Sequence, residues 1–121
     1  MELALRGKIA LVTGASAGIG RAVAQALAAE GVQLTLCARG EAPLRALTDE
    51  LERHYGIVAL AVPADLSTEA GIAQLVAAHT ARFGALDILV NNAGSIRAGS
   101  LLSKSESEWQ QDFALKFWGY V

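Results

Sequence analysis

Short apolar segments alternate with segments of helical period along most of this chain. The apolar segments have the length of strands and cover residues 8–12, 32–37, 57–62 and 86–90. Strands that are joined through helices run parallel, and such crossovers are right-handed. The pattern therefore predicts a doubly wound parallel sheet of the α/β class, a three-layer α/β/α arrangement with strand order 3-2-1-4.

Helices are predicted in the three segments between these strands. The first covers residues 18–30, and its expected apolar face consists of Ile19, Val23, Ala26 and Leu27. The inner faces of the second and third are marked by Leu44, Leu47 and Leu51, and by Ile72, Leu75, Val76 and Phe83. Gly56 and Gly84 are placed to end the second and third helices, and Ser67 or Thr68 to begin the third.

The last part of the chain predicts a further helix. Ser103 and Ser105 each precede a glutamate by three positions, which is the spacing of a capping box. The helix should run toward the end of the chain with apolar residues on more than one side, namely Trp109, Phe113, Phe117 and Tyr120 on one and Leu115, Trp118 and Val121 on another. With the strand at residues 86–90 left at an open edge, we expect a domain that is incomplete at its C-terminal side.

Composition excludes several classes of function. The formal net charge of −2 comes without any basic run or acidic tail, so neither nucleic acid nor a membrane surface is an expected partner. No apolar stretch approaches the ~20 residues of a membrane span. The single cysteine, Cys37, excludes an internal disulfide and is expected to be a buried apolar residue. The expected compartment is the cytoplasm.

A glycine-rich loop directly follows the first predicted strand, where residues 13–20 read Thr-Gly-Ala-Ser-Ala-Gly-Ile-Gly. Gly14 permits a tight turn, Gly18 lets the backbone approach a pyrophosphate, and Gly20 lets the helix pack closely on the strand. The amino end of the helix favours phosphate through its free N–H groups and its dipole. An ordinary glycine-rich turn is the alternative. No Gly-Lys-Ser/Thr follows, which disfavours a P-loop.

The spacing G-x-x-x-G-x-G resembles that of the short-chain dehydrogenase/reductase family. The opening residues 5–12, the pair Asp65-Leu66 and the run Asn91-Asn92-Ala93-Gly94 also resemble that family's motifs, in the same order. The resemblance covers the whole chain and implies the N-terminal, cofactor-binding half of a Rossmann-type domain, spanning residues 1–121.

The resemblance also implies roles for single residues. Ser16 and Ile19 would line the pyrophosphate and nicotinamide side of the loop. Asp65 would accept a hydrogen bond from the adenine amino group, and Leu66 would donate through its backbone. Asn91 would tie neighbouring strands together. The residues expected at the cofactor are Gly14, Ser16, Ala17, Gly18, Ile19, Gly20, Arg39, Asp65, Leu66, Asn92, Ala93 and Gly94.

Arg39 at the end of the second strand predicts NADP(H) as the cofactor. Dinucleotide folds that use NAD tend to place an acid at this point for the ribose 2′-OH, whereas a guanidinium binds a 2′-phosphate through charge-assisted bonds. A solvated surface arginine is the alternative. Many NADP-binding relatives carry a second basic residue in the glycine loop, where this chain has Ala17, so the preference is expected to be modest.

No catalytic residue is predicted within the chain. The family uses a Ser and a Tyr-x-x-x-Lys pair, but four residues after Tyr55 comes Ala59, and only Val121 follows Tyr120. Lys116 aligns with an asparagine that supports the family's proton relay. His54 and His79 are expected at surface positions, and their spacing predicts no metal site.

Two functions remain open at this point. The first is an NADP(H)-dependent oxidoreductase acting on a small carbonyl or alcohol substrate, a homo-oligomer (dimer or tetramer) at full length. The alternative is a non-catalytic, truncated fragment that binds dinucleotide. Residues 1–121 alone are expected to show no dehydrogenase turnover.

Overall fold

A parallel sheet with helices on both faces forms the described part of the chain, which in this computed structural model is residues 5–92 and the backbone of residues 118–120. The strands are β1 (Ile9–Thr13), β2 (Gln33–Ala38), β3 (Ala59–Pro63), β4 (Ile88–Asn91) and β5 (Trp118–Tyr120). Their order in the sheet is β3-β2-β1-β4-β5. The predicted α/β class and the order 3-2-1-4 of the first four strands are therefore confirmed.

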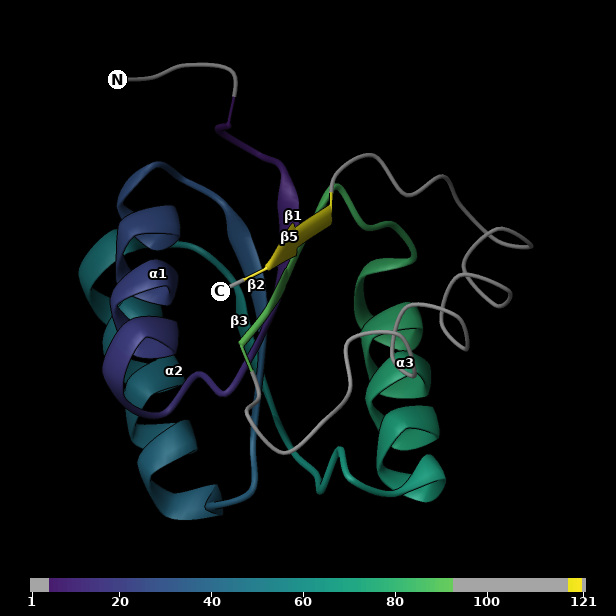
Figure 1. Cartoon of the computed structure of the whole chain (residues 1–121). Coiled ribbons are helices and arrows are strands. Elements are labelled where there is room, and N and C mark those ends of the chain that lie inside the picture. The colour runs from purple at the N-terminus through teal and green to yellow at the C-terminus, as the bar shows by residue number, and fades with distance from the viewer. Residues whose placement is uncertain (1–4, 93–117, 121) are drawn as a thin grey trace.

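The three described helices divide between the two faces of the sheet. Helices α1 (Gly18–Ala29) and α2 (Glu41–Tyr55) cover one face, and α3 (Glu69–Phe83) covers the other (Figure 1). The predicted boundaries are confirmed, since Gly56 and Gly84 follow α2 and α3 with φ of 71° and 69°, and Thr68 caps α3. None of these helices combines the length and hydropathy needed to cross a membrane.

Alternation along the strands builds a separate core on each face. On β2, Leu34 and Leu36 join the cluster under α1 and α2, whereas Cys37 belongs to the cluster under α3. Each fully buried leucine side chain contributes about 1.5–3 kcal/mol relative to an exposed one. Cys37 is buried as predicted, and this burial raises the pKa of its thiol to about 12, against a smaller lowering by its bond to the Ala64 carbonyl.

Helix α1 packs on the sheet through a different face from the predicted one. Its buried residues are Gly20, Ala24 and Ala28, while Ile19 is 60% exposed. The prediction weighted side chains by hydrophobicity, but a row of small residues lets the helix backbone lie closer to the strands. The larger Val23 and Leu27 are only partly buried, beside this row.

The chain end differs from the helix predicted there. Residues 118–120 form β5, which runs parallel to β4 with Val90 opposite Gly119. The expectation of an open edge beside residues 86–90 was therefore wrong. Apolar residues on more than one side also suit a strand covered on both faces, and pairing satisfies the backbone groups of β4. The rest of the predicted helix, including Lys116, lies outside the described residues.

His79 is fully buried, contrary to the surface position expected for it, whereas His54 is exposed as expected. Nε2 of His79 donates to the Ala85 carbonyl at 2.8 Å, and Nδ1 of His79 accepts from the Thr35 hydroxyl at 2.7 Å. Because a carbonyl can only accept, Nε2 carries a hydrogen, and burial favours the neutral ring, in which Nδ1 is the acceptor. Burial lowers the pKa of His79, against a smaller raising by the Ala85 bond.

We predict that His79 makes the protein less stable toward acid. The lowered pKa means that, as the pH falls below about 6.5, the unfolded chain takes up this proton before the folded one does. The contribution of neutral His79 is complete above about pH 6.5 and declines below it, by at most about 1.4 kcal/mol per pH unit. Urea unfolding at a series of pH values gives the free energy of unfolding as a function of pH, and below about pH 6.5 its slope should be flatter for His79→Gln than for the wild type. The exposed-site control His54→Gln should keep the wild-type slope, and an unchanged slope in His79→Gln would contradict the assignment.

Candidate functional site

The carboxyl ends of β1, β2, β3 and β4 lie along one edge of the sheet, where the loops of interest leave it. From β1 the chain passes through α1 to β2 on one side, whereas β4 pairs with β1 on the other side. Doubly wound sheets bind their ligands outside the carboxyl ends of strands where the order reverses in this way. The candidate site therefore lies beyond the ends of β1 and β4.

The glycine-rich loop brings the amino end of α1 against the end of β1. Gly14 and Gly18 have φ of 61° and 58°, in the left-handed region that favours glycine. A Cβ on Gly20 would collide with the Gly14 carbonyl and would lie 2.7 Å from the Asn92 amide nitrogen. These contacts require glycine at position 20 whether or not a ligand binds.

No side chain caps the amino end of α1. Its N-cap residue, Ala17, makes no side-chain hydrogen bond, and its first turn contains no acidic residue. By contrast, Thr68 caps α3, and acidic residues lie in the first turns of α2 and α3, at Glu41 and Glu69. The first N–H groups and the positive end of the α1 dipole are therefore available to an anion.

A buried hydroxyl joins the glycine-rich loop to the end of β4. Thr13 Oγ1 donates to Asn91 Oδ1 at 3.0 Å and accepts from the Asn92 backbone N–H at 2.8 Å. The Asn92 side chain donates through Nδ2 to the Gly14 carbonyl at 3.3 Å. Asn91 thus links neighbouring strands. Sequence reasoning missed Thr13, although a hydroxyl at the end of an apolar strand was a signal that could have identified it.

Asp65 lies in the loop that follows β3, with its carboxylate held by Ser67. Asp65 Oδ1 accepts from the Ser67 backbone N–H at 3.0 Å and from its hydroxyl at 2.7 Å. The pKa of Asp65 is lowered chiefly by the Ser67 hydroxyl, then by the Ser67 N–H, with a smaller contribution from the positive charge of Arg39. Asp65 is therefore an ionised acceptor at neutral pH.

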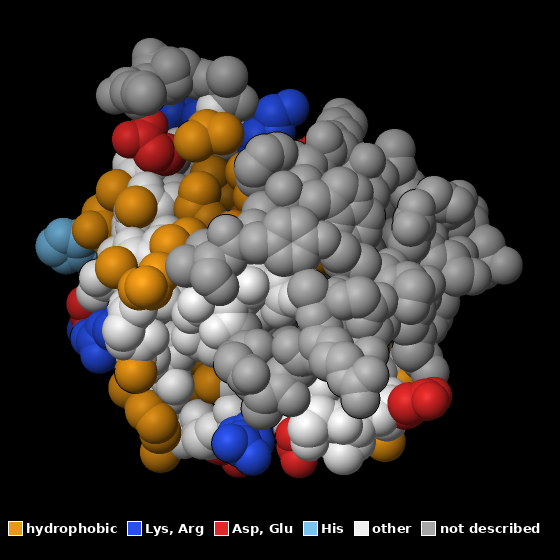
Figure 2. All heavy atoms as spheres, in the orientation of Figure 1, with side chains coloured by type: hydrophobic (Ala, Val, Ile, Leu, Met, Phe, Trp, Pro, Cys, Tyr) orange, Lys and Arg blue, Asp and Glu red, His pale blue; other side chains and the backbone are white. Residues whose placement is uncertain are grey.

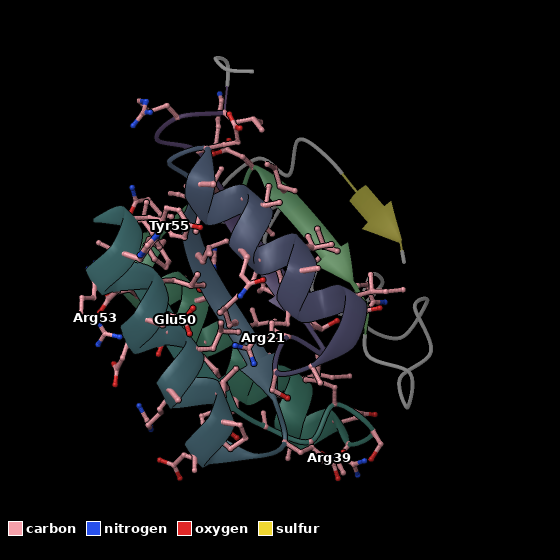
Figure 3. All side chains as sticks on the ribbon, turned by 90° about the vertical axis from the view of Figure 1, so that its left-hand side faces the viewer. Arg21, Arg39, Glu50, Arg53 and Tyr55 are labelled. Carbon is pink, nitrogen blue, oxygen red and sulfur yellow. The ribbon has the colours of Figure 1, made fainter. Side chains whose placement is uncertain are left out.

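Arg39 is exposed at the residue that follows β2. The Ala64 N–H donates to the Ala38 carbonyl at 3.0 Å, so the segments after β2 and β3 leave the sheet together and bring Arg39 toward Asp65. Arg39 forms no ion pair with any other residue of the segment 5–92. Figure 3 shows it at the end of α2 opposite Arg53 and Tyr55.

The remaining expected site residues differ in exposure. Ser16 is partly buried, Ala17 and Gly18 are exposed, and Leu66 is 4% exposed within the cluster under α3. Ala93 and Gly94 lie outside the described residues. In the coloured part of the face in Figure 2, charged side chains of both signs are interspersed.

The described residues at this edge offer groups that can bind a ligand. The described residues at this edge provide a cationic guanidinium, an ionised carboxylate and an uncapped helix terminus. Tyr55, for which no catalytic role is expected, is the last residue of α2 and lies at the end of this helix that is far from Arg39 (Figure 3). Within residues 5–92, the edge carries no Tyr, Lys or His.

Comparison with known proteins identifies related sequences and folds. The model of the family described as short chain dehydrogenase matches residues 8–121. The 2,3-dihydro-2,3-dihydroxybenzoate dehydrogenase of Bacillus subtilis (strain 168) is 37% identical over 115 residues, which are 95% of this chain and 44% of that protein.

Two solved structures have a similar fold. L-sorbose reductase from Gluconobacter frateurii, complexed with NADPH and L-sorbose, is 31% identical with a TM-score of 0.77, covering 93% of this chain and 48% of that chain. The 3-ketoacyl-(acyl-carrier-protein) reductase from Brucella melitensis, complexed with NADH, is 42% identical with a TM-score of 0.69, covering 75% and 36%. The chain spans less than half the length of these relatives.

We predict that the Thr13 hydroxyl stabilises the site. Thr13→Val keeps the shape of the side chain but removes both hydrogen bonds at a buried position, which should cost about 1–3 kcal/mol in the free energy of unfolding. Thr13→Ser retains the hydroxyl and should cost less. Urea unfolding of both variants checks this expectation, and a loss in Thr13→Val that is no larger than the loss in Thr13→Ser would contradict it.

Proposed function

The chain belongs to the short chain dehydrogenase family, and on that premise we propose that residues 1–121 are the cofactor-binding half of an NADP(H)-dependent oxidoreductase. The proposed reaction is hydride transfer between the nicotinamide and a small carbonyl or alcohol substrate. The relatives are named as dehydrogenases and reductases, which supports the general reaction type.

The uncapped amino end of α1 is the observation that carries this proposal. A pyrophosphate needs N–H donors, a favourable dipole and room for close approach. Ala17 supplies no capping side chain, while Gly14 and Gly18 adopt backbone conformations that suit a tight loop. The residues present therefore fit an anionic dinucleotide, with its pyrophosphate on Gly14, Ser16, Ala17, Gly18, Ile19 and Gly20.

The two ends of the dinucleotide would meet different residues of this edge. The adenosine would lie toward Arg39, Asp65 and the Leu66 backbone. Asn92 and Ala93, at and after the end of β4, would flank the adenosine ribose. The nicotinamide side would extend from Ile19 toward Gly94, which would leave room near the ring. The 60% exposed Ile19 offers the apolar surface that a nicotinamide ring can cover.

The residues of this chain would contribute binding and orientation. The bound nicotinamide would supply or accept the hydride, since the cofactor carries that chemistry. The α1 amino end would hold the phosphates, and the Thr13 hydroxyl would keep Asn92 against the glycine-rich loop. Ala93 and Gly94 lie outside the described residues.

Arg39 supports NADP(H) over NAD(H). Its guanidinium is exposed, and no carboxylate of residues 5–92 forms an ion pair with it. A 2′-phosphate would supply that partner, whereas the 2′-hydroxyl of NADH carries no charge for it to bind. The structural relatives are complexed with NADPH in one case and NADH in the other, so cofactor choice depends on this chain's own residues.

A second candidate is a chain that binds dinucleotide without turnover. The observation that favours it is the lack of a Tyr-x-x-x-Lys pair within the 121 residues. NADPH-linked reduction of a carbonyl compound by the purified chain would exclude this candidate. Dinucleotide binding without reduction would support it for these residues.

We predict that Arg39→Asp changes cofactor preference. The ratio of NADPH affinity to NADH affinity should fall by on the order of tenfold to a hundredfold, because a charge-assisted interaction with the 2′-phosphate is lost. Fluorescence titration with each reduced dinucleotide measures both dissociation constants. Arg53→Asp is the matched control, since it makes the same charge change at the opposite end of α2 (Figure 3). An unchanged ratio in Arg39→Asp would show that another group discriminates.

A further inference from the structure

The carboxylate of Asp65 is held through one of its oxygens. The Ser67 backbone N–H and hydroxyl both donate to Oδ1, at 3.0 and 2.7 Å. The other carboxylate oxygen, Oδ2, accepts no hydrogen bond from the described part of the chain, so it remains able to accept one. Two bonds to one oxygen fix the rotation of the carboxylate and therefore the direction of the other oxygen.

The backbone of this loop is fixed by contacts that do not involve the Ser67 hydroxyl. The Asp65 carbonyl accepts from the Thr68 N–H at 3.3 Å and from its hydroxyl at 3.0 Å. Thr68 Oγ1 in turn accepts from the Gly71 N–H at 2.9 Å. A Cβ on Gly71 would collide with the Asp65 carbonyl, so the first turn of α3 lies directly against it. Removing the exposed Ser67 hydroxyl should therefore leave the loop backbone in place.

The charge state of Asp65 limits what Oδ2 can bind. As an ionised carboxylate it accepts hydrogen bonds and donates none. A purine that carries an exocyclic amino group presents a donor, whereas hypoxanthine presents a carbonyl oxygen at the same position. Two acceptors facing each other repel, so the direction of Oδ2 can determine which purine is bound.

We propose that Ser67 is a positioning residue for purine selection, which turns the Asp65 carboxylate so that Oδ2 meets the amino group of adenine. This inference rests on the proposed function, because it requires the adenosine end of a dinucleotide beside Asp65. Ser67 itself does not touch the purine and acts through the carboxylate.

The test compares NADPH with its hypoxanthine analogue on the full chain. Fluorescence titration gives the dissociation constant of each, and their ratio measures purine selection. In Ser67→Ala the preference for adenine should fall about three- to tenfold, the equivalent of one hydrogen bond. Ser67→Thr keeps the hydroxyl and should restore the wild-type ratio.

Thr68→Val is the matched control at the neighbouring position. It removes a hydroxyl that caps α3 and donates to the Asp65 carbonyl. Both Ser67 bonds to the carboxylate and the Thr68 N–H bond to the Asp65 carbonyl remain, so the variant should lower the thermal stability but keep the wild-type ratio. A merely structural role of Ser67 would weaken both dinucleotides equally and leave the ratio unchanged.

The outcomes separate this inference from the proposed function. If wild type binds NADPH and Ser67→Ala keeps the full preference for adenine, the role of Ser67 is overturned while the proposed function stands. If wild type binds neither dinucleotide, the proposed function fails and the inference fails with it. A reduced ratio in Ser67→Ala that Ser67→Thr restores supports both.

Discussion

The close approach of α1 to the loop that leaves β1 is the contact on which the site depends. Gly20 has no room for a side chain between the Gly14 carbonyl and the Asn92 amide. Ala24 and Ala28 continue this row of small buried residues along the helix. Because no large side chain holds α1 away from the sheet, its amino end lies beside the end of β1. The same packing that completes the core thus places free N–H donors at the edge where ligands bind in such folds.

A similar contact recurs after β3, with a different result. Gly71 lies against the Asp65 carbonyl as Gly20 lies against that of Gly14. At α3, however, Thr68 caps the first turn and Glu69 lies within it. The Thr68 hydroxyl accepts from the Gly71 N–H, and the negative charge of Glu69 opposes the positive end of the helix dipole. The two connections share a packing solution, and only the α1 terminus retains unused capacity for an anion.

Much of the fold could be predicted because it depends on local patterns. Strand-length apolar runs, helical spacing and glycine signals correctly predicted four strands, three helices and the order of the strands. The glycine-rich loop was also evident, since Gly14 and Gly18 adopt backbone conformations that favour glycine. Such features can be read from a few consecutive residues.

The features that were missed depend on contacts between distant segments. His79 was expected at the surface because its side chain is polar, but Thr35, 44 positions away in the sequence, provides it with a buried partner. Thr13 gained its role from Asn91 and Asn92, which only the pairing of β1 with β4 brings close. Pairing of β5 with β4 likewise outweighed a helical pattern at residues 118–120. Hydrophobic periodicity describes neighbouring residues and therefore cannot predict partners that are distant in the sequence.

A dinucleotide that binds in this way places its phosphates on the amino end of α1. Backbone amide shifts of the isotopically labelled chain, followed by NMR during titration with NADPH, report this contact residue by residue. The largest shifts should fall on residues 14–20, with a second group at residues 39 and 65–66. Saturable binding with no shift in residues 14–20, or no binding at all, would contradict this placement of the phosphates.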